Sequence, residues 1–79
     1  MRIPKDLSGK DLIKLLAKYG YEITNQRGSH IKITTLDNGE HHIAIPNHNP
    51  IKIGTLNGII KQVAGHFSLT KNQVLEKLF

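Results

Sequence analysis

Residues 30–46 read HIKITTLDNGEHHIAIP, and this stretch decides the fold. Isoleucines at positions 31, 33, 43 and 45 alternate with polar or small residues on either side of the sequence Asp-Asn-Gly. Strict alternation is typical of a strand that buries one face, and Asn-Gly is typical of a turn that joins antiparallel strands. The stretch therefore predicts a hairpin whose isoleucines face a hydrophobic core.

The length of the turn decides which residues pair across this hairpin. A two-residue loop at residues 38–39 would place Ile33 opposite Ala44 and would turn the apolar sides of the two strands to different faces. A three-residue loop at residues 37–39, with its glycine left-handed in a β-bulge, places Ile33 opposite Ile43. We expect the three-residue loop, because it gathers the isoleucines on one face.

That register also determines which side chains point away from the core. Helices must cover the apolar face of the sheet, since nothing else in the chain can, and the polar face is expected to stay open. The side chains expected on this open face are His30, Lys32, Thr34 and His42.

The residues before the hairpin fit a third strand. The segment Tyr21–Gln26 has suitable residues, and a loop at residues 27–29 would align Ile23 with Ile33. The same loop would put the last residue of that strand opposite His30. We therefore expect a three-stranded antiparallel meander with one apolar and one polar face.

The chain before the sheet predicts a helix over residues 9–19. Ser8 can cap it, and Asp11, three residues on, occupies the capping-box position at the positive helix end. Gly20 supplies a stop. The residues that recur at helical spacing are Leu12, Leu15, Leu16 and Tyr19.

The chain after the sheet predicts two more helices. Residues 46–50 form a loop, and an apolar stripe then indicates a helix from Gly54 or Thr55 to Gly65. The pattern Thr70-x-x-Gln73 is a capping box for a short last helix. The predicted fold is α+β, in the order helix, three strands, helix and a short extra C-terminal helix, with the helices on one face of an antiparallel sheet.

The composition limits what the protein can do. A chain of 79 residues forms one domain, which we place at residues 1–79, and it is too small to enclose a deep cofactor cavity. The absence of cysteine excludes disulfides, thiolate metal sites and cysteine nucleophiles. Eleven lysines and arginines against six acidic residues give a net charge of +5, which favours an anionic partner such as nucleic acid.

Nothing in the sequence indicates a membrane or an export signal. No apolar run approaches the length of a membrane span, and the start of the chain, MRIPKDLSGKD, lacks the apolar core of a signal peptide. We therefore expect a soluble, cytoplasmic protein.

Five histidines are many for this length, and three interpretations compete. A metal site formed by His41, His42 and His48 is disfavoured, because adjacent strand residues point to opposite faces and no set of carboxylates lies nearby. We expect neither a metal ion nor another cofactor. Simple solvation of the side chain is the favoured interpretation for His41 and His66.

The third interpretation is acid–base catalysis at His30. Histidine exchanges protons near neutral pH because its unperturbed pKa is about 6.5. Cleavage of RNA needs a proton removed from a 2′-hydroxyl, another given to the leaving 5′-oxygen, and positive charge beside the phosphate. Arg27, Lys32 and the amides of Gly28 and Ser29 supply cations and donors for an anion. Spacing alone suggests this chemistry and does not select it.

Other chemistries fit the sequence less well. The chain has no phosphate-binding loop with its lysine, no His-Glu-x-x-His and no Gly-x-Ser-x-Gly. Ser29 is adjacent to His30, but neighbours in sequence rarely have the mutual geometry that a serine nucleophile and its base require. We therefore expect Ser29 to belong to the turn.

Further short segments before and after Gly28-Ser29-His30 contribute to a longer pattern. They are Gly9-Lys10-Asp11-Leu12 with Leu15-Leu16, Tyr19-Gly20-Tyr21, Arg27, Ile45-Pro46 with His48, Gly54-Thr55-Leu56 with Ile59-Ile60-Lys61-Gln62, and Ala64-Gly65. Gly-Ser-His alone is a weak signal. Taken together, these segments resemble the HicA (YcfA-like) family of small toxins from toxin–antitoxin modules over nearly the whole chain.

The resemblance implies a fold and a reaction. The implied fold is double-stranded-RNA-binding-domain-like, which agrees with the predicted order of elements. The implied activity is metal-independent endoribonuclease cleavage of mRNA, which inhibits translation and growth, with His30 as the catalytic general acid or base. A HicB-type antitoxin is the implied partner and is expected to cover the His30 face. His48 is a common feature of the family, and its role stays open between structure and RNA contact.

The RNA contacts are less well defined than the catalytic residue. Many relatives carry another aromatic or basic residue directly after the histidine, where this chain has Ile31. Two other functions stay open, namely a non-catalytic RNA-binding module that reads RNA shape, and an interaction protein whose open face only pairs with a partner. The expected RNA-binding residues are Arg27, Gly28, Ser29, Lys32, His42 and His48.

Overall fold

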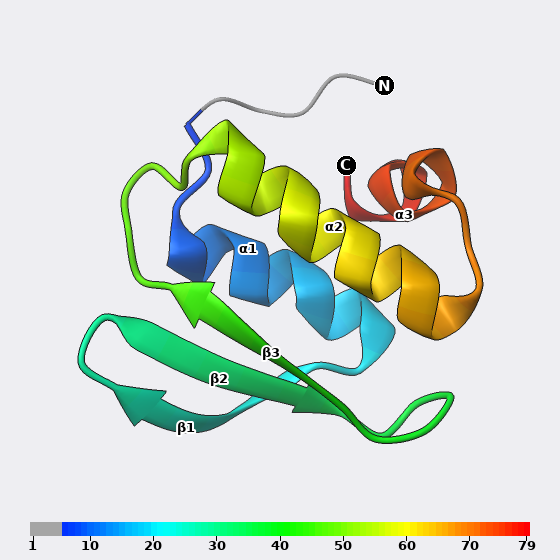
Figure 1. The fold of residues 1–79 in the computed structure, drawn as a ribbon, viewed down its shortest axis with the longest axis horizontal. Coiled ribbons are helices and arrows are strands. Elements are labelled where there is room, and N and C mark those ends of the chain that lie inside the picture. The colour runs from blue at the N-terminus through cyan, green and yellow to red at the C-terminus, as the bar shows by residue number, and fades with distance from the viewer. Residues whose placement is uncertain (1–5) are drawn as a thin grey trace.

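The computed structural model describes residues 6–79 (Figure 1). Two predictions involve the first five residues, namely the domain at residues 1–79 and the polar start of the chain. These five residues lie outside the described part of the structure. The order of the elements confirms the predicted α+β fold. The elements are α1 (Gly9–Leu16), the 3₁₀ helix η1 (Ala17–Tyr19), β1 (Glu22–Arg27), β2 (His30–Thr35), β3 (His41–Pro46), α2 (Ile53–Phe67) and α3 (Lys71–Leu78).

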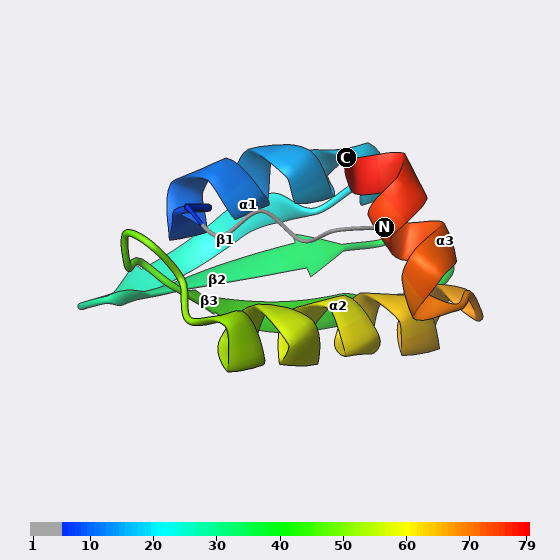
Figure 2. The same ribbon diagram turned by 90° about the horizontal axis from the view of Figure 1, so that it is seen from above.

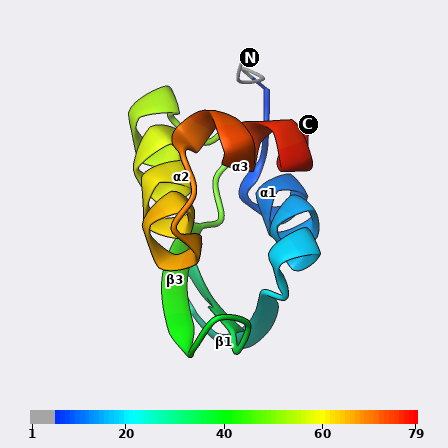
Figure 3. The ribbon, with the colours of Figure 1, turned by 90° about the vertical axis from the view of Figure 1, so that its right-hand side faces the viewer.

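The elements form a helical layer on one face of a sheet. The sheet is antiparallel, with the strand order β1-β2-β3. Seen from above, α1 and α2 lie apart, with the strands visible between them (Figure 2). Figure 3 shows both helices on the same side of the sheet, with α3 between them on the side away from the sheet. Within residues 6–79 no helix or strand covers the other face, which we call the open face.

The register between β2 and β3 is the predicted one. Ile33 pairs with Ile43, and Ile31 pairs with Ile45. All four side chains are at most 2% exposed, so the apolar face of the hairpin is buried under the helices. The alternate residues therefore face outward on the open face.

The turn between β2 and β3 is wider than predicted. Strand pairing stops one residue earlier on each side, so the loop spans residues 36–40 rather than 37–39. Gly39 has the predicted positive φ, at 100°, and Asn38 also has a positive φ, at 57°. The register is unchanged because one residue is added on each side.

The first strand pairs with β2 in the predicted register only at its start. Ile23 pairs with Ile33 as expected, but the register shifts between Ile23 and Asn25. A β-bulge of this kind adds one residue to one strand, and every later residue then moves one place along the partner strand. The prediction that Gln26 lies opposite His30 is therefore wrong.

Arg27 takes that place instead. It is the last residue of β1 and pairs with His30, the first residue of β2. The turn is therefore formed by Gly28 and Ser29, and not by residues 27–29 as predicted. Gly28 has a φ of 54°, in the left-handed region that glycine adopts without steric cost. The bulge thus moves Arg27 out of the turn and onto the sheet.

The predicted capping box begins α1. The Ser8 hydroxyl accepts a hydrogen bond from the Asp11 amide at 3.1 Å, and the Asp11 carboxylate accepts one from the Ser8 amide at 3.3 Å. These hydrogen bonds lower the pKa of the Asp11 carboxyl. The predicted helix over residues 9–19 is confirmed, and its last turn is a 3₁₀ helix. Gly20 follows this turn with a φ of 83°.

Helix α2 is longer than predicted. It begins slightly earlier and runs through Gly65, the predicted stop, to Phe67. A glycine inside a helix costs only about 1 kcal/mol, and the packing of Phe67 against the core offsets this cost. Ser68 ends the helix with a φ of 55°, and α3 then begins at the predicted capping box of Thr70 and Gln73. None of the helices in the described part of the chain is long and apolar enough to cross a membrane.

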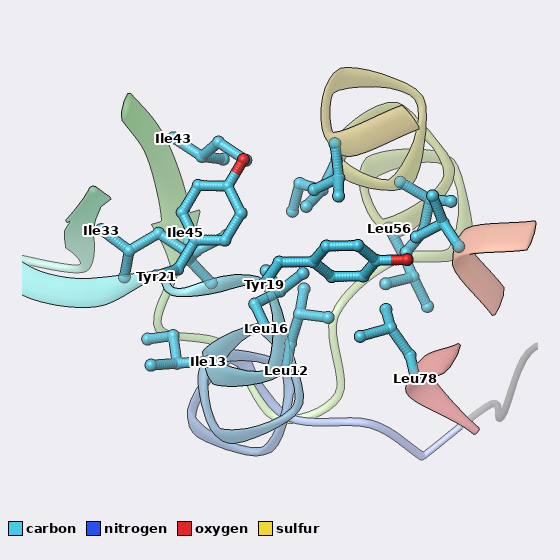
Figure 4. Close-up of a cluster of buried hydrophobic side chains, with 14 of the residues drawn as sticks. Leu12, Ile13, Leu16, Tyr19, Tyr21, Ile33, Ile43, Ile45, Leu56 and Leu78 are labelled. Carbon is cyan, nitrogen blue, oxygen red and sulfur yellow. The ribbon is translucent and has the colours of Figure 1, made fainter. Parts of the chain in front are cut away.

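The core lies between the sheet and the helices. Thr35 is fully buried, and its hydroxyl donates to the carbonyl oxygen of Tyr19 at 2.8 Å, which ties the end of η1 to β2. Burial of each aliphatic side chain of the core stabilises the folded state by roughly 1.5–3 kcal/mol relative to exposure of that side chain to water. Figure 4 shows the part of this core formed by Leu12, Ile13, Leu16, Tyr19, Tyr21, Ile33, Ile43, Ile45, Leu56 and Leu78.

His41 and His66 are not the solvated side chains that the sequence suggested. Nδ1 of His41 lies 2.8 Å from the Tyr21 hydroxyl, and the two imidazoles stack with ring centroids 4.4 Å apart. Burial raises the pKa of Tyr21 to about 12. Nε2 of His66 donates to the carbonyl oxygen of Asp37 at 2.9 Å. These contacts fasten the turn between β2 and β3 to the end of α2.

Backbone hydrogen bonds hold the loop between β3 and α2 in place. The amide of Asn47 donates to the carbonyl oxygen of Ser29 at 2.6 Å, and the amide of Gly9 donates to that of His48 at 2.9 Å. Gly9 is buried, and a Cβ atom there would meet the carbonyl oxygen of Pro46. The start of α1 therefore approaches the loop closely only because residue 9 has no side chain.

Gly9→Ala tests this close approach. The added Cβ must push the backbone of Pro46 away, so we expect the free energy of unfolding to fall by about 1–3 kcal/mol, the usual cost of overpacking. Gly58→Ala is the matched control, because a Cβ at that helical position meets no atom within 4 Å, and alanine gains about 0.5–1 kcal/mol there. Urea unfolding followed by circular dichroism measures both values. A neutral or stabilising Gly9→Ala would show that the start of α1 does not approach Pro46 this closely.

The stacked histidines make stability depend on pH. Burial, and then the nearby charges of His66 and His42, lower the pKa of His41. His41 therefore binds a proton more readily in the unfolded chain than in the folded protein. Neutral His41 makes its full contribution to the free energy of unfolding above the unfolded pKa of about 6.5. This contribution is lost as the pH falls through the lower folded pKa. We expect the urea midpoint to drop as the pH is lowered below about 6.5, and His41→Gln to flatten this dependence. The same pH dependence in both proteins would refute this role.

Candidate active site

One end of the open face carries the side chains with useful chemistry. His30 is exposed there, and strand pairing puts Arg27 on one side of it and Pro46 on the other. Lys32 lies two residues further along β2 and, because side chains alternate, on the same face. Directly opposed residues have Cβ atoms about 4.5–5.5 Å apart, so the Arg27 guanidinium can reach a group bound at His30.

A shallow cavity of about 380 Å³ lies on the β1 side of His30. Two of its lining residues have basic side chains, and two others have side-chain amides. The arrangement brings His30, Arg27 and Lys32 together around one hollow. The lining residues are Asn25, Gln26, Arg27, His30, Lys32 and Ala44.

A second cavity, of about 420 Å³, lies on the other side of His30, toward the start of α2. His30 and Ala44 line both cavities, so the two hollows adjoin across the sheet. The structure thereby brings His48 to the same site as His30. The lining residues of this second cavity are His30, Ala44, Pro46, His48, Lys52 and Thr55.

Charge is unevenly distributed over the open face. The two cavities contain the cations of Arg27, Lys32 and Lys52, and no carboxylate is among their lining residues in the described part of the chain. Acidic side chains lie at the opposite end of the sheet, where Glu22 begins β1 and Glu40 precedes β3. An anion is therefore attracted to the His30 end of the face.

His42 lies on the open face but lines neither cavity. It pairs with Thr34, and its Nδ1 lies 2.7 Å from the Thr34 hydroxyl. Its Nε2 lies 2.7 Å from a carboxylate oxygen of Glu40 and donates to it, because a carboxylate can only accept. His42 and His30 therefore share a face without being brought together.

Gly28 and Ser29 form the turn that presents His30. Neither residue lines the two cavities. The Ser29 carbonyl oxygen accepts a hydrogen bond from the Asn47 amide, which links this turn to the loop that carries His48. Their observed part in the site is thus to position its two halves.

The histidines considered for a metal site do not meet. His41 contacts Tyr21 on the helix side of the sheet, whereas His42 contacts Glu40 on the open face. His48 lies at the other end of the sheet, in the second cavity. Across residues 6–79, no group of three or more histidine, cysteine, aspartate or glutamate residues is placed to hold a metal ion.

Sequence reasoning missed Ala44, Lys52 and Thr55. The last two reach the site because the loop after β3 folds back beside the sheet, a long-range arrangement that no local pattern reveals. Ala44 did carry a signal, because alanine is a poor strand former and stands between isoleucines on a strand with large neighbours. A break in a local rule of this kind often marks a functional position.

The arrangement can transfer a proton beside a bound anion. An exposed imidazole exchanges protons at neutral pH, and neighbouring cations stabilise negative charge on a group that it touches. Fold and site together define a small α+β protein with a double-stranded-RNA-binding-domain-like layout and a cationic site on its uncovered sheet face.

Comparison with known families agrees with this class. Residues 9–64, more than half of the chain, match the family model described as "HicA toxin of bacterial toxin-antitoxin". The chain belongs to the HicA toxin family, which makes it a toxin and implies an antitoxin partner. The matched span contains the sheet and both cavities and ends within α2. No curated protein and no solved structure gives a significant match.

Proposed function

We propose that the protein is a metal-independent endoribonuclease that cleaves mRNA and thereby inhibits translation and growth, with His30 as general acid or base. The observation that carries this proposal is the position of His30, exposed on the open face beside Arg27 and Lys32 in a chain of the HicA toxin family. The proposed unit of activity is one domain, residues 1–79, acting in the cytoplasm without a cofactor.

Cleavage of RNA at a 2′-hydroxyl requires two proton transfers. The 2′-oxygen attacks phosphorus and forms a new P–O bond, and its proton passes to a base. The bond from phosphorus to the 5′-oxygen breaks, and that oxygen takes a proton from an acid. An imidazole can serve in either role at neutral pH. His30 is the histidine that lines both cavities and is therefore our candidate for one of the two roles.

The cations beside His30 support the proposal. Negative charge builds up on the phosphate in the transition state, and cations already held in place stabilise it without reorganisation. Arg27 offers a planar guanidinium that can bind two phosphate oxygens at once, and Lys32 offers a compact ammonium. The amides of Gly28 and Ser29 are further proposed donors to the RNA backbone.

Two more histidines are proposed RNA contacts. His48 lines the same cavity as His30, so it is the first candidate for the next contact along the RNA. His42 is engaged by Glu40 and Thr34 at the far end of the face, so it would meet only RNA that extends along the sheet.

His30→Ala is the direct test of the proposed function. We expect this change to lower cleavage of an mRNA fragment in excess EDTA by about 10²–10⁴-fold, the usual contribution of a general acid or base. The circular dichroism spectrum should not change, because the side chain is exposed. Lys61→Ala, on an exposed position of α2 outside both cavities, is the control and should cleave like the wild type.

Three outcomes of that assay are informative. Equal cleavage by the wild type and His30→Ala would refute the catalytic assignment. Loss of wild-type cleavage in EDTA would refute metal independence. A wild-type protein that binds RNA with a steep salt dependence but cleaves none would show instead a non-catalytic RNA-binding module.

We further propose that a HicB-type antitoxin inhibits the toxin by covering the open face. A site that gathers Arg27, Lys32 and Lys52 without a carboxylate should attract an acidic surface. Modification of histidines by diethyl pyrocarbonate, mapped by mass spectrometry, should then be suppressed at His30 in the toxin–antitoxin complex. Albumin, an unrelated acidic protein, is the control. Equal reactivity of His30 in the free and bound toxin would rule out masking of the site.

A further inference from the structure

We infer that a single strand of RNA crosses the open face in one continuous groove whose floor is Ala44. The groove runs across the strands, from β1 past His30 to the start of α2. Beyond His30 it ends in a second binding site for the strand, which we call the far subsite. This inference rests on the proposed function, because it describes how the same site holds its substrate. The far subsite consists of His48, Lys52 and Thr55.

The continuity of the groove follows from its shared walls. The two cavities, of about 380 and 420 Å³, lie on opposite sides of His30, and both are lined by His30 and Ala44. Ala44 pairs with Lys32 and is exposed on the open face. Its single methyl group leaves the two hollows joined, whereas a long side chain at this point would fill the passage between them.

The distribution of charge gives the groove its direction. Arg27 and Lys32 line the cavity on the β1 side of His30, and Lys52 lines the cavity toward α2, so cations follow the groove from one cavity to the other. A path along the strands would instead lead to Glu22 and Glu40. RNA held in the groove therefore does not contact His42, which lies beside Glu40 and would be met only on that other path. A positively charged groove that follows the backbone is the usual means of holding a single strand.

The two halves of the groove are held rigidly to each other. The turn before His30 is bonded to the loop after β3 through the Ser29 carbonyl oxygen and the Asn47 amide, at 2.6 Å. The loop is also bonded to the start of α1, from the Gly9 amide to the His48 carbonyl oxygen at 2.9 Å. Since the backbone beneath both halves is already ordered, binding loses little conformational freedom.

The side chains of the far subsite match the chemistry of one nucleotide. The Lys52 ammonium can pair with a phosphate, and the Thr55 hydroxyl can donate to a phosphate oxygen or bond to a 2′-hydroxyl. The His48 imidazole offers a flat surface on which an unpaired base can stack. A base within a duplex is already stacked on its neighbours, so this site favours a single strand.

Ala44→Leu tests the floor of the groove. In a His30→Ala background, which prevents cleavage, we expect it to weaken binding of a fluorescein-labelled single-stranded RNA by at least about tenfold. Thr24→Leu, which places the same side chain at an exposed strand position outside both cavities, is the matched control and should bind as before. The exposed strand position accepts leucine, and thermal unfolding checks this. Equal binding by the two variants would overturn the inference, as would equal or tighter binding of the same RNA annealed to its complement.

Lys52→Gln tests the far subsite independently of the floor. Loss of one phosphate contact should lower the slope of log affinity against log salt by about 0.7 for a single strand. Lys61→Gln removes the same charge from an exposed position of α2 outside the groove and should leave the slope unchanged. Equal slopes for the two variants would overturn the far subsite.

These tests separate the groove from the proposed function. They measure binding without cleavage, so their failure would leave the role of His30 as a nuclease residue standing. Conversely, full cleavage by His30→Ala would remove the catalytic proposal. The effects of Ala44→Leu and Lys52→Gln on binding, measured then with a 2′-O-methylated RNA that has no 2′-hydroxyl to attack phosphorus, would still decide whether the groove exists.

Discussion

The pairing of four isoleucines across β2 and β3 is the constraint on which the rest of the structure depends. Side chains on a strand alternate between two faces, so burying Ile31, Ile33, Ile43 and Ile45 under the helices leaves one orientation for every residue between them. A slip of one residue would expose the isoleucines to water and turn His30 toward the core. The outward position of His30 is therefore determined by hydrophobic burial of its neighbours, and needs no polar contact of its own.

Two local features then assemble the site on this frame. The bulge after Ile23 moves the rest of β1 by one residue and places Arg27 opposite His30, at an edge strand next to a candidate site, where bulges are often found. The backbone bond between Ser29 and Asn47 joins the turn before β2 to the loop after β3. Cations from distant parts of the chain thus gather around one imidazole, as expected of a site that binds a phosphate and transfers a proton beside it.

The parts of the fold that depend on local patterns could be predicted from the sequence. Alternation predicted the β2–β3 register, and side-chain spacing predicted both capping boxes. The bulge could not be predicted, because β1 is exposed along its whole length and has no apolar alternation to show a shift. The place of Lys52 and the stacking of His41 on His66 were missed because they join segments far apart in the chain. The toxin role follows from membership of the family. It could not be derived from interatomic distances or from the burial of side chains.

We propose that RNA binds to the open face around His30. Nuclear magnetic resonance of ¹⁵N-labelled His30→Ala protein, titrated with single-stranded RNA, tests the location of binding directly. We expect the largest changes in backbone amide shifts within residues 25–32, at Ala44 and within residues 48–55. The largest changes on α1 and α3, with the open face unaffected, would contradict this proposal.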